Sequence, residues 1–167
     1  MKKTLIISLE YSPSIGGVAT YVSQLAASLP PELIVVLAPP LPKHQQEASP
    51  APLHRVIRES LYFPKFLWPR WLKLFFVVKK LVKQERIEII HVHHVLPVGY
   101  VAYLIKKIYG IPYIIFSHGT DIAFAAKTKR KRTLLVRVAR ASLQVITNSM
   151  NLRERLLAQF PQLEAKT

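Results

Sequence analysis

Four of the chain's six histidines fall in two short segments, and they are its most versatile chemical groups. His91, His93 and His94 form the first segment, and His118 follows Ser117 in the second. Imidazole titrates near neutral pH, so it can hydrogen-bond a ligand hydroxyl or exchange a proton with it. The structural alternative, a histidine that bonds the backbone at a strand end, has equal standing from position alone. We take His118 as the candidate catalytic residue.

Three further polar residues are candidate ligand contacts. Asp121 lies three positions after His118 and has three open roles: it can orient the imidazole, cap the next segment or contact hydroxyl groups of a ligand. Asn148 and Ser149 stand directly before a predicted helix, where asparagine and serine are favoured N-caps. We expect them to cap that helix, and a contact with ligand stays open for both.

The histidine segment also raises the question of a metal site. His91 and His93 are two positions apart on a predicted strand, so their side chains share one face. A protein zinc site needs at least a third ligand, and His118 and Asp121 are the obvious candidates for it. We predict no metal here. Instead we expect one or two histidines, His93 and His94 among them, to line a cleft and one to pack against a neighbour.

A pair of glycines, Gly16 and Gly17, opens the first predicted helix. Glycine lets a ligand approach the backbone closely, and a helix N-terminus favours an anion such as a diphosphate. An ordinary turn is the alternative interpretation. The spacing is not the G-x-G-x-x-G pattern of dinucleotide-binding proteins, which argues against an enzyme that uses NAD.

Strands and helices that alternate along the chain must position these residues. Leucine-rich and β-branched runs predict strands, and apolar residues spaced three or four apart predict helices. Such alternation predicts an α/β fold: a doubly wound, mostly parallel, Rossmann-like sheet with helices on both faces, in three layers, as one domain over residues 1–167. We expect strands at 4–9, 33–38, 54–58, 87–92, 113–117 and 143–147, and helices at 18–29, 70–84, 97–109, 127–141 and 150–160.

The polar residues gather where the predicted strands end. The glycine pair, the two histidine segments and the Asn148–Ser149 pair each follow a strand, while the strand interiors carry almost no polar residue. Ligands of parallel α/β sheets bind at the carboxyl ends of the strands. A core does not need polar groups at these positions, so the pattern predicts a ligand-binding cleft.

Composition limits the function classes. The chain has 167 residues, 50% of them hydrophobic, and no cysteine, which excludes disulfides and thiolate chemistry and fits a reducing cytoplasm. No leader peptide or membrane-spanning run stands out. The proline-rich stretch 39–52 is expected to be a mobile loop. The net charge of +15 points to anionic partners: a membrane surface, nucleic acid or a polyanionic substrate.

Two segments concentrate this positive charge. The first mixes lysines with aromatic residues, as a helix at a membrane interface does, although a solvated surface helix is the alternative. The second places cations in the first turns of a helix, where the helix dipole disfavours them, so anionic headgroups or phosphates would offset that cost. The aromatic content favours a membrane over nucleic acid. The predicted membrane-binding residues are Trp68, Arg70, Trp71, Lys73, Lys79, Lys80 and Lys83 in the first segment, and Lys129, Arg130, Lys131 and Arg132 in the second.

Several segments, in order, resemble the family 4 glycosyltransferases of the GT-B fold. They are Tyr11-Ser-Pro-Ser-Ile-Gly-Gly-Val18, Ile89-Ile-His-Val-His-His94, Gly110-Ile-Pro-Tyr113, Phe116-Ser-His-Gly-Thr-Asp-Ile122 and Val145-Ile-Thr-Asn-Ser149. The resemblance covers nearly the whole chain. It implies the N-terminal, acceptor-side domain of a retaining hexosyltransferase that uses a nucleotide-diphosphate sugar as donor, with no tightly bound cofactor and no metal.

The resemblance also assigns roles to residues. It implies that the loop matching Gly16 and Gly17 lies against the donor diphosphate and sugar, and that His118 contacts the transferred sugar or the acceptor. The acceptor would be a glycan or lipid-linked molecule, and the protein would be cytoplasmic and peripheral at the inner face of the membrane. The family's donor-side Arg-Lys pair and its two glutamates eight positions apart have no match. We therefore expect the C-terminal nucleotide-sugar domain to be absent and the isolated chain to be inactive.

Two other function classes are alternatives to a glycosyltransferase. A basic Rossmann-like binding module without catalysis, for anionic lipid or RNA, is the principal one. A flavodoxin-like or response-regulator domain is disfavoured, because the first strand lacks the acidic cluster of a phosphoacceptor site and no phosphate loop rich in serine and threonine follows it.

Overall fold

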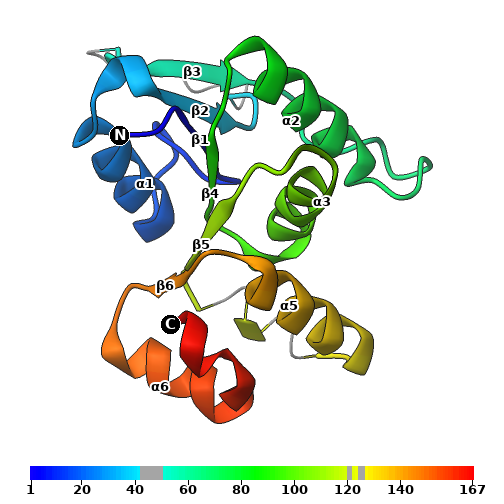
Figure 1. Ribbon diagram of the computed structural model, residues 1–167. Coiled ribbons are helices and arrows are strands. Elements are labelled where there is room, and N and C mark those ends of the chain that lie inside the picture. Colours follow the sequence, from blue (N-terminus) through cyan, green and yellow to red (C-terminus); the bar gives the residue numbers. More distant parts are fainter. Residues whose placement is uncertain (42–50, 120–121, 124–126) are drawn as a thin grey trace. The chain divides into compact units, whose positions relative to one another are not determined.

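The computed structural model describes residues 1–41, 51–119, 122–123 and 127–167. Its six strands form one parallel sheet in the order β3-β2-β1-β4-β5-β6 (Figure 1). This order steps outward from β1 in one direction and from β4 in the other, as in a doubly wound fold. The predicted Rossmann-like α/β class is confirmed. The strands are β1 (Thr4–Ile7), β2 (Ile34–Ala38), β3 (Arg55–Arg58), β4 (Ile89–Val92), β5 (Tyr113–Ser117) and β6 (Val145–Thr147).

Helices connect most of the strands. The α-helices are α1 (Gly17–Ala27), α2 (Leu72–Gln84), α3 (Tyr100–Tyr109), α5 (Lys129–Ala141) and α6 (Met150–Gln159). Shorter helical turns are η1 (Pro31–Leu33), η2 (Val95–Gly99) and η3 (Pro161–Lys166). The chain forms two compact units, Met1–Ile90 and His91–Thr167.

The core of the first unit forms where α1 packs on the sheet. Ile6, Ile34 and Val36 point to one face because side chains two residues apart share a face of a strand. Val22 and Ala26, one helical turn apart on α1, cover them. Parallel pairing puts Ile6 beside Val36 and sets the register of β1 against β2. This core fixes where the loop after β1 begins.

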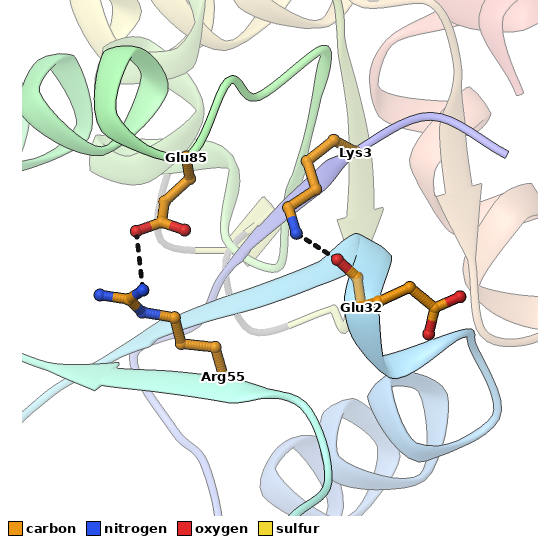
Figure 2. A network of polar contacts seen from close by, with 4 residues as sticks. All are labelled: Lys3, Glu32, Arg55 and Glu85. Atoms are coloured by element: carbon orange, nitrogen blue, oxygen red, sulfur yellow. Dashed lines mark hydrogen bonds and ion pairs between the residues drawn. The ribbon is translucent and has the colours of Figure 1, made fainter.

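Polar contacts tie the amino end of β1 to its surroundings within the first unit. The backbone N–H of Lys3 donates to a carboxylate oxygen of Glu88 at 2.8 Å, and the Lys3 side chain donates to the carbonyl of Glu32. Arg55 and Glu85 form an ion pair at 3.3 Å between β3 and the end of α2 (Figure 2). The Arg55 side chain is 65% exposed, so this pair contributes at most about 1 kcal/mol.

The second unit packs α3 and α5 around β5. The buried hydroxyl of Tyr113 donates to the carbonyl of Val138 on α5, and burial raises the pKa of this tyrosine. Lys106 on α3 donates to the carbonyl of Ala141 at 2.6 Å, at the carboxyl end of α5. Parallel pairing of β5 with β6 brings Ser117 beside Thr147. The residues that follow these two strands therefore emerge at the same edge of the sheet.

Several element boundaries differ from the predicted ones. The predicted helix 97–109 begins as an α-helix only at Tyr100; before it lies the π-type turn η2, in which Leu96 is extended (φ −132°, ψ 138°). Proline at position 97 disfavours helical backbone in the residue before it, which accounts for the extended Leu96. The predicted helix 127–141 begins at Lys129, because Thr128 caps it by accepting the N–H of Lys131. Most of the predicted loop 39–52 lies outside the described residues.

Other boundaries agree closely with the predictions. Strand β5 has the predicted bounds. Gly110 ends α3 in the left-handed conformation (φ 73°), as expected for a glycine at a helix C-terminus. The short helix η3 was not predicted, and its buried Leu163 belongs to the core of the second unit.

Candidate functional site

His118 and His93 form a close pair in the second unit. The Nδ1 of His93, at the loop after β4, lies 3.2 Å from the Nε2 of His118, which follows β5. The two ring planes are nearly parallel, inclined by 17°, and the centroids are 5.5 Å apart. His93 is fully buried, whereas His118 is partly exposed. Two histidines that are 25 residues apart in the sequence thus form one hydrogen-bonded unit.

Phe116 on β5 lies against the rings of two histidines. The ring of His93 lies 4.7 Å from that of Phe116 at 13°, and His91 lies 5.2 Å from the same ring. Burial lowers the pKa of His91 to about 4. Burial and then the nearby His118, His91 and His94 lower the pKa of His93 to about 2. Both His91 and His93 are therefore neutral at physiological pH, and His93 packs against neighbours while His118 reaches the surface.

A pocket of about 410 Å³ opens at the ends of β5 and β6. His118 and Gly119 line it from the end of β5, and Asn148 and Ser149 line it from the end of β6. Arg155 on α6 adds a positive charge that was not predicted from the sequence. Arg155 follows Asn151 by four residues and so shares its face of α6, and this spacing could have identified it from the sequence. Three predicted site residues thus meet around one pocket, with hydrogen-bonding groups and a cation suited to a polyhydroxylated or anionic ligand.

Ser149 has the capping role expected for it. Its hydroxyl accepts the N–H of Leu152 at 3.2 Å and begins α6. Asn148, one residue earlier, is exposed and lines the pocket without being the capping residue. Asp121 lies outside the described residues. The pair Asn148–Ser149 therefore divides into a structural residue and one whose side chain is available to the pocket.

The fold does not require glycine at positions 16 and 17. Gly16 has an extended backbone (φ 164°), and an added methyl group would meet only a Glu10 carboxylate oxygen at 3.4 Å. An added methyl group at Gly17 would meet nothing within 4 Å. By contrast, Gly119 has φ +98°, and a methyl group there would approach Leu152 at 3.2 Å. Gly119 is explained by the fold, whereas the open space around Gly17 leaves room for a ligand to approach the first helix.

A second polar cluster, not predicted from the sequence, lies in the first unit. The Tyr11 hydroxyl and the His54 Nε2 are 2.6 Å apart, and both residues are buried. Burial raises the pKa of Tyr11 and lowers that of His54. The Arg58 guanidinium donates to the carbonyl of Ser12. These residues line a pocket of about 380 Å³ beside α1, with apolar walls that include Ala26 and Val56.

Within the part of the chain that the structure describes, no group of three or more histidine, cysteine, aspartate or glutamate side chains could hold a metal ion. The His91 and His93 imidazoles lie against Phe116, and His93 in turn contacts His118.

The first basic segment presents an apolar loop followed by an amphipathic helix. A backbone hydrogen bond from Phe63 to Arg70 (3.0 Å) closes the loop, and the Arg70 side chain donates to the Phe63 carbonyl at 2.9 Å. The loop tip exposes Phe66 and Trp68, which are 83% and 88% exposed. In α2 the apolar face is buried, and Phe76 is exposed beside the lysines. Trp71, Lys73 and Lys79 are half-buried; Lys80 and Lys83 are exposed.

The second basic segment begins α5. Its first turn contains no acidic residue, so nothing in that turn offsets the helix dipole. Lys129, Arg130 and Arg132 are exposed, and Lys131 is half-buried. Arg132 has partners within its unit: it donates to the carbonyl of Gln159 at 3.2 Å and lies 4.9 Å from the Phe160 ring centroid.

None of the described helices is both long and apolar enough to cross a bilayer.

The fold and the pocket define the class as a Rossmann-like α/β protein with a polar pocket at the carboxyl ends of its strands. The model of glycosyltransferase family 4 matches residues 15–166, and the chain belongs to this family. No curated protein matches the sequence.

Solved structures of low sequence identity share the fold. Sucrose-phosphate synthase from Thermosynechococcus elongatus is 17% identical, with a TM-score of 0.69 over 96% of this chain and 45% of its own. HepE from Anabaena, solved with UDP and glucose, is 15% identical, with a TM-score of 0.69 over 98% of this chain and 43% of its own. A second HepE structure holds UDP-glucose. The chain thus spans less than half the length of these two proteins. Their fold is GT-B, and the chain matches an N-terminal domain of it.

Proposed function

We propose that residues 1–167 form one acceptor-side, N-terminal domain of a retaining glycosyltransferase that uses a nucleotide-diphosphate sugar. The observation that carries the proposal is the pocket where His118, Asn148 and Ser149 meet in a chain of glycosyltransferase family 4. HepE binds UDP-glucose, and a UDP-sugar is the donor class we propose here. His118 contacts the sugar or the hydroxyl that attacks it, and Asn148 hydrogen-bonds ligand hydroxyl groups.

The loop at Gly16 and Gly17 has a separate role in the proposal. An anionic diphosphate approaches the amino end of α1, where backbone N–H groups and the helix dipole favour negative charge. The space for an added methyl group at Gly17 supports this role, because the fold itself does not use that space. His94, half-buried after β4, and Asp121 complete the proposed set of substrate contacts.

The proposal is tested by incubating the purified chain with UDP-glucose and mixed glycan acceptors. We expect weak binding and no sugar transfer, because the chain has no match to the family's donor-side Arg-Lys pair or paired glutamates. Robust transfer by residues 1–167 would contradict the assignment to one half of an enzyme.

The basic segments support a second part of the proposal, that the protein works at an anionic membrane surface. The loop tip with Phe66 and Trp68 offers exposed aromatic surface, and Lys80 and Lys83 lie on the exposed side of the following helix. Aromatic rings bury in the interfacial region of a bilayer, while each lysine gains about 1 kcal/mol near anionic headgroups. A non-catalytic module that binds lipid or RNA through the same residues is the alternative.

Vesicle sedimentation tests the membrane part. We expect binding to vesicles that contain anionic lipid and little binding to neutral ones. A variant with Lys79→Glu, Lys80→Glu and Lys83→Glu should lose most of this binding, and Ile108→Ser, which removes a half-exposed apolar group from α3, should not. Equal binding by wild type and the triple variant would refute the role of α2. Binding of the chain to RNA without binding to vesicles would favour the alternative, a non-catalytic binding module.

A further inference from the structure

His93 does not reach the solvent, yet it contacts the residue proposed to act on the ligand. Its ring is fully buried, stacked on Phe116 and nearly parallel to the ring of His118. Its Nδ1 lies at hydrogen-bond distance, 3.2 Å, from the Nε2 of His118. A buried residue in this place cannot bind the ligand directly, so any effect on the ligand passes through His118.

The hydrogen bond requires one proton between the two nitrogens. His93 is neutral, because burial and the surrounding histidines His118, His91 and His94 lower its pKa to about 2. A neutral imidazole carries one N–H and one acceptor nitrogen. When His118 is protonated, its Nε2–H donates to the Nδ1 of His93. When His118 is neutral, the shared proton couples the tautomer of one ring to that of the other.

We propose that His93 is a positioning residue, which holds the ring plane and the tautomer of His118 through the bond between its Nδ1 and the Nε2 of His118. An imidazole beside a pocket otherwise samples several rotamers and two tautomers, and ordering it lowers the entropy of the side chain. The hydrogen bond to His93, whose own ring is stacked on Phe116, removes that freedom before a ligand binds. Such preorganisation is what a group that must meet a ligand atom within about 0.5 Å requires.

The proposal rests on the proposed function only in that His118 meets the ligand. The contact between His93 and His118 is testable without any substrate.

Two substitutions separate the hydrogen bond from the packing. His93→Phe keeps a flat ring stacked on Phe116 and beside His118, and it removes both ring nitrogens. His93→Asn removes the ring and keeps a polar amide atom at the same number of bonds from Cα as Nδ1. A purely structural role of His93 predicts that the phenylalanine variant is closer to the wild type; the positioning role predicts that the asparagine variant is.

The measurement is the nitrogen-15 chemical shift of both ring nitrogens of His118 in protein labelled at histidine. We expect two well-separated shifts in the wild type, typical of one dominant tautomer. They should move toward each other by more than half their separation in His93→Phe and return in His93→Asn. Unchanged His118 shifts in His93→Phe would overturn the proposal. Averaged His118 shifts in the wild type would also overturn it, and this second result does not depend on the folding of any variant.

Titration of the same samples with UDP-glucose keeps the two proposals separable. A single His118 tautomer whose nitrogen shifts do not change with UDP-glucose would support the positioning role of His93 and count against the proposed function. Averaged His118 tautomers with a clear response to UDP-glucose would overturn the positioning role and support the proposed function.

Discussion

At the scale of single residues, the buried imidazoles decide how the protein responds to acid. His91 and His93 have folded-state pKa values of about 4 and about 2, against an ordinary value of 6.5. Below about pH 6.5 the unfolded chain therefore binds protons at these two histidines that the folded chain does not bind. Stability is full above about pH 6.5 and falls as the pH decreases toward the folded-state values. In that range each such histidine contributes up to about 1.4 kcal/mol per pH unit to the slope of the unfolding free energy against pH.

His91 gives a direct test of this acid sensitivity. We expect His91→Gln to flatten the dependence of unfolding free energy on pH by about 1 kcal/mol per unit between pH 6 and pH 4.5. Urea unfolding at four pH values, with the slope on urea concentration checked for constancy, measures it. Parallel profiles for the variant and the wild type would show that His91 takes up its proton in the folded state.

The sequence predicted that three of the candidate site residues lie at one edge of the sheet, and the roles of these residues stay predictions. His118, Asn148 and Ser149 were placed together because each follows a parallel strand, and strand ends share one edge of the sheet. The burial of His93 was not predictable, since it depends on Phe116 stacking across two strands. The pairing of Tyr11 with His54 joins residues 43 positions apart and has no local signal.

At the scale of elements, two glycines at helix ends differ in whether the fold requires them. Gly110 ends α3 with φ +73°, a conformation that costs an alanine about 1 kcal/mol, although an added methyl group would meet nothing within 4 Å. Gly17 begins α1 with space around it. We expect Gly110→Ala to lower the unfolding free energy by about 1 kcal/mol and Gly17→Ala to leave it unchanged or raise it slightly.

The two substitutions act as controls for each other. Chemical denaturation measures stability, and UDP-glucose titration measures ligand binding. Gly17→Ala should weaken binding several-fold without loss of stability, and Gly110→Ala should do the opposite. A stable Gly17→Ala variant with wild-type affinity would remove the glycine loop from the proposed site.

Element boundaries were predictable where one local signal dominates and less so where tertiary packing contributes. Strand β5 and the glycine stop of α3 follow from apolar runs and from Gly110. The predicted start of α5 is two residues too early, because basic residues lie on both sides of the Thr128 cap and hide the boundary. The helix η3 was missed because only the burial of Leu163, a tertiary effect, indicates it.

At the scale of the whole molecule, the positive charge and the pocket belong to different segments of the chain. The net charge of +15 is concentrated in the loop and helix around α2 and in the first turn of α5, whereas the pocket at β5 and β6 holds only one cation, Arg155, among its described lining residues. In the proposed function, the basic segments determine where the protein works and the strand ends determine what it binds.

Residue-resolved NMR titration of the purified chain with UDP-glucose, with glucose and UDP as separate arms, tests the central claim most directly. We predict saturable shifts for His118, Gly119, Asn148 and Ser149, and separately for Gly16 and Gly17, at millimolar ligand. The UDP arm should favour the glycine loop and the glucose arm the pocket. Shifts absent from both groups of residues, or confined to the basic segments, would contradict the assignment of this chain as the ligand-holding half of a glycosyltransferase.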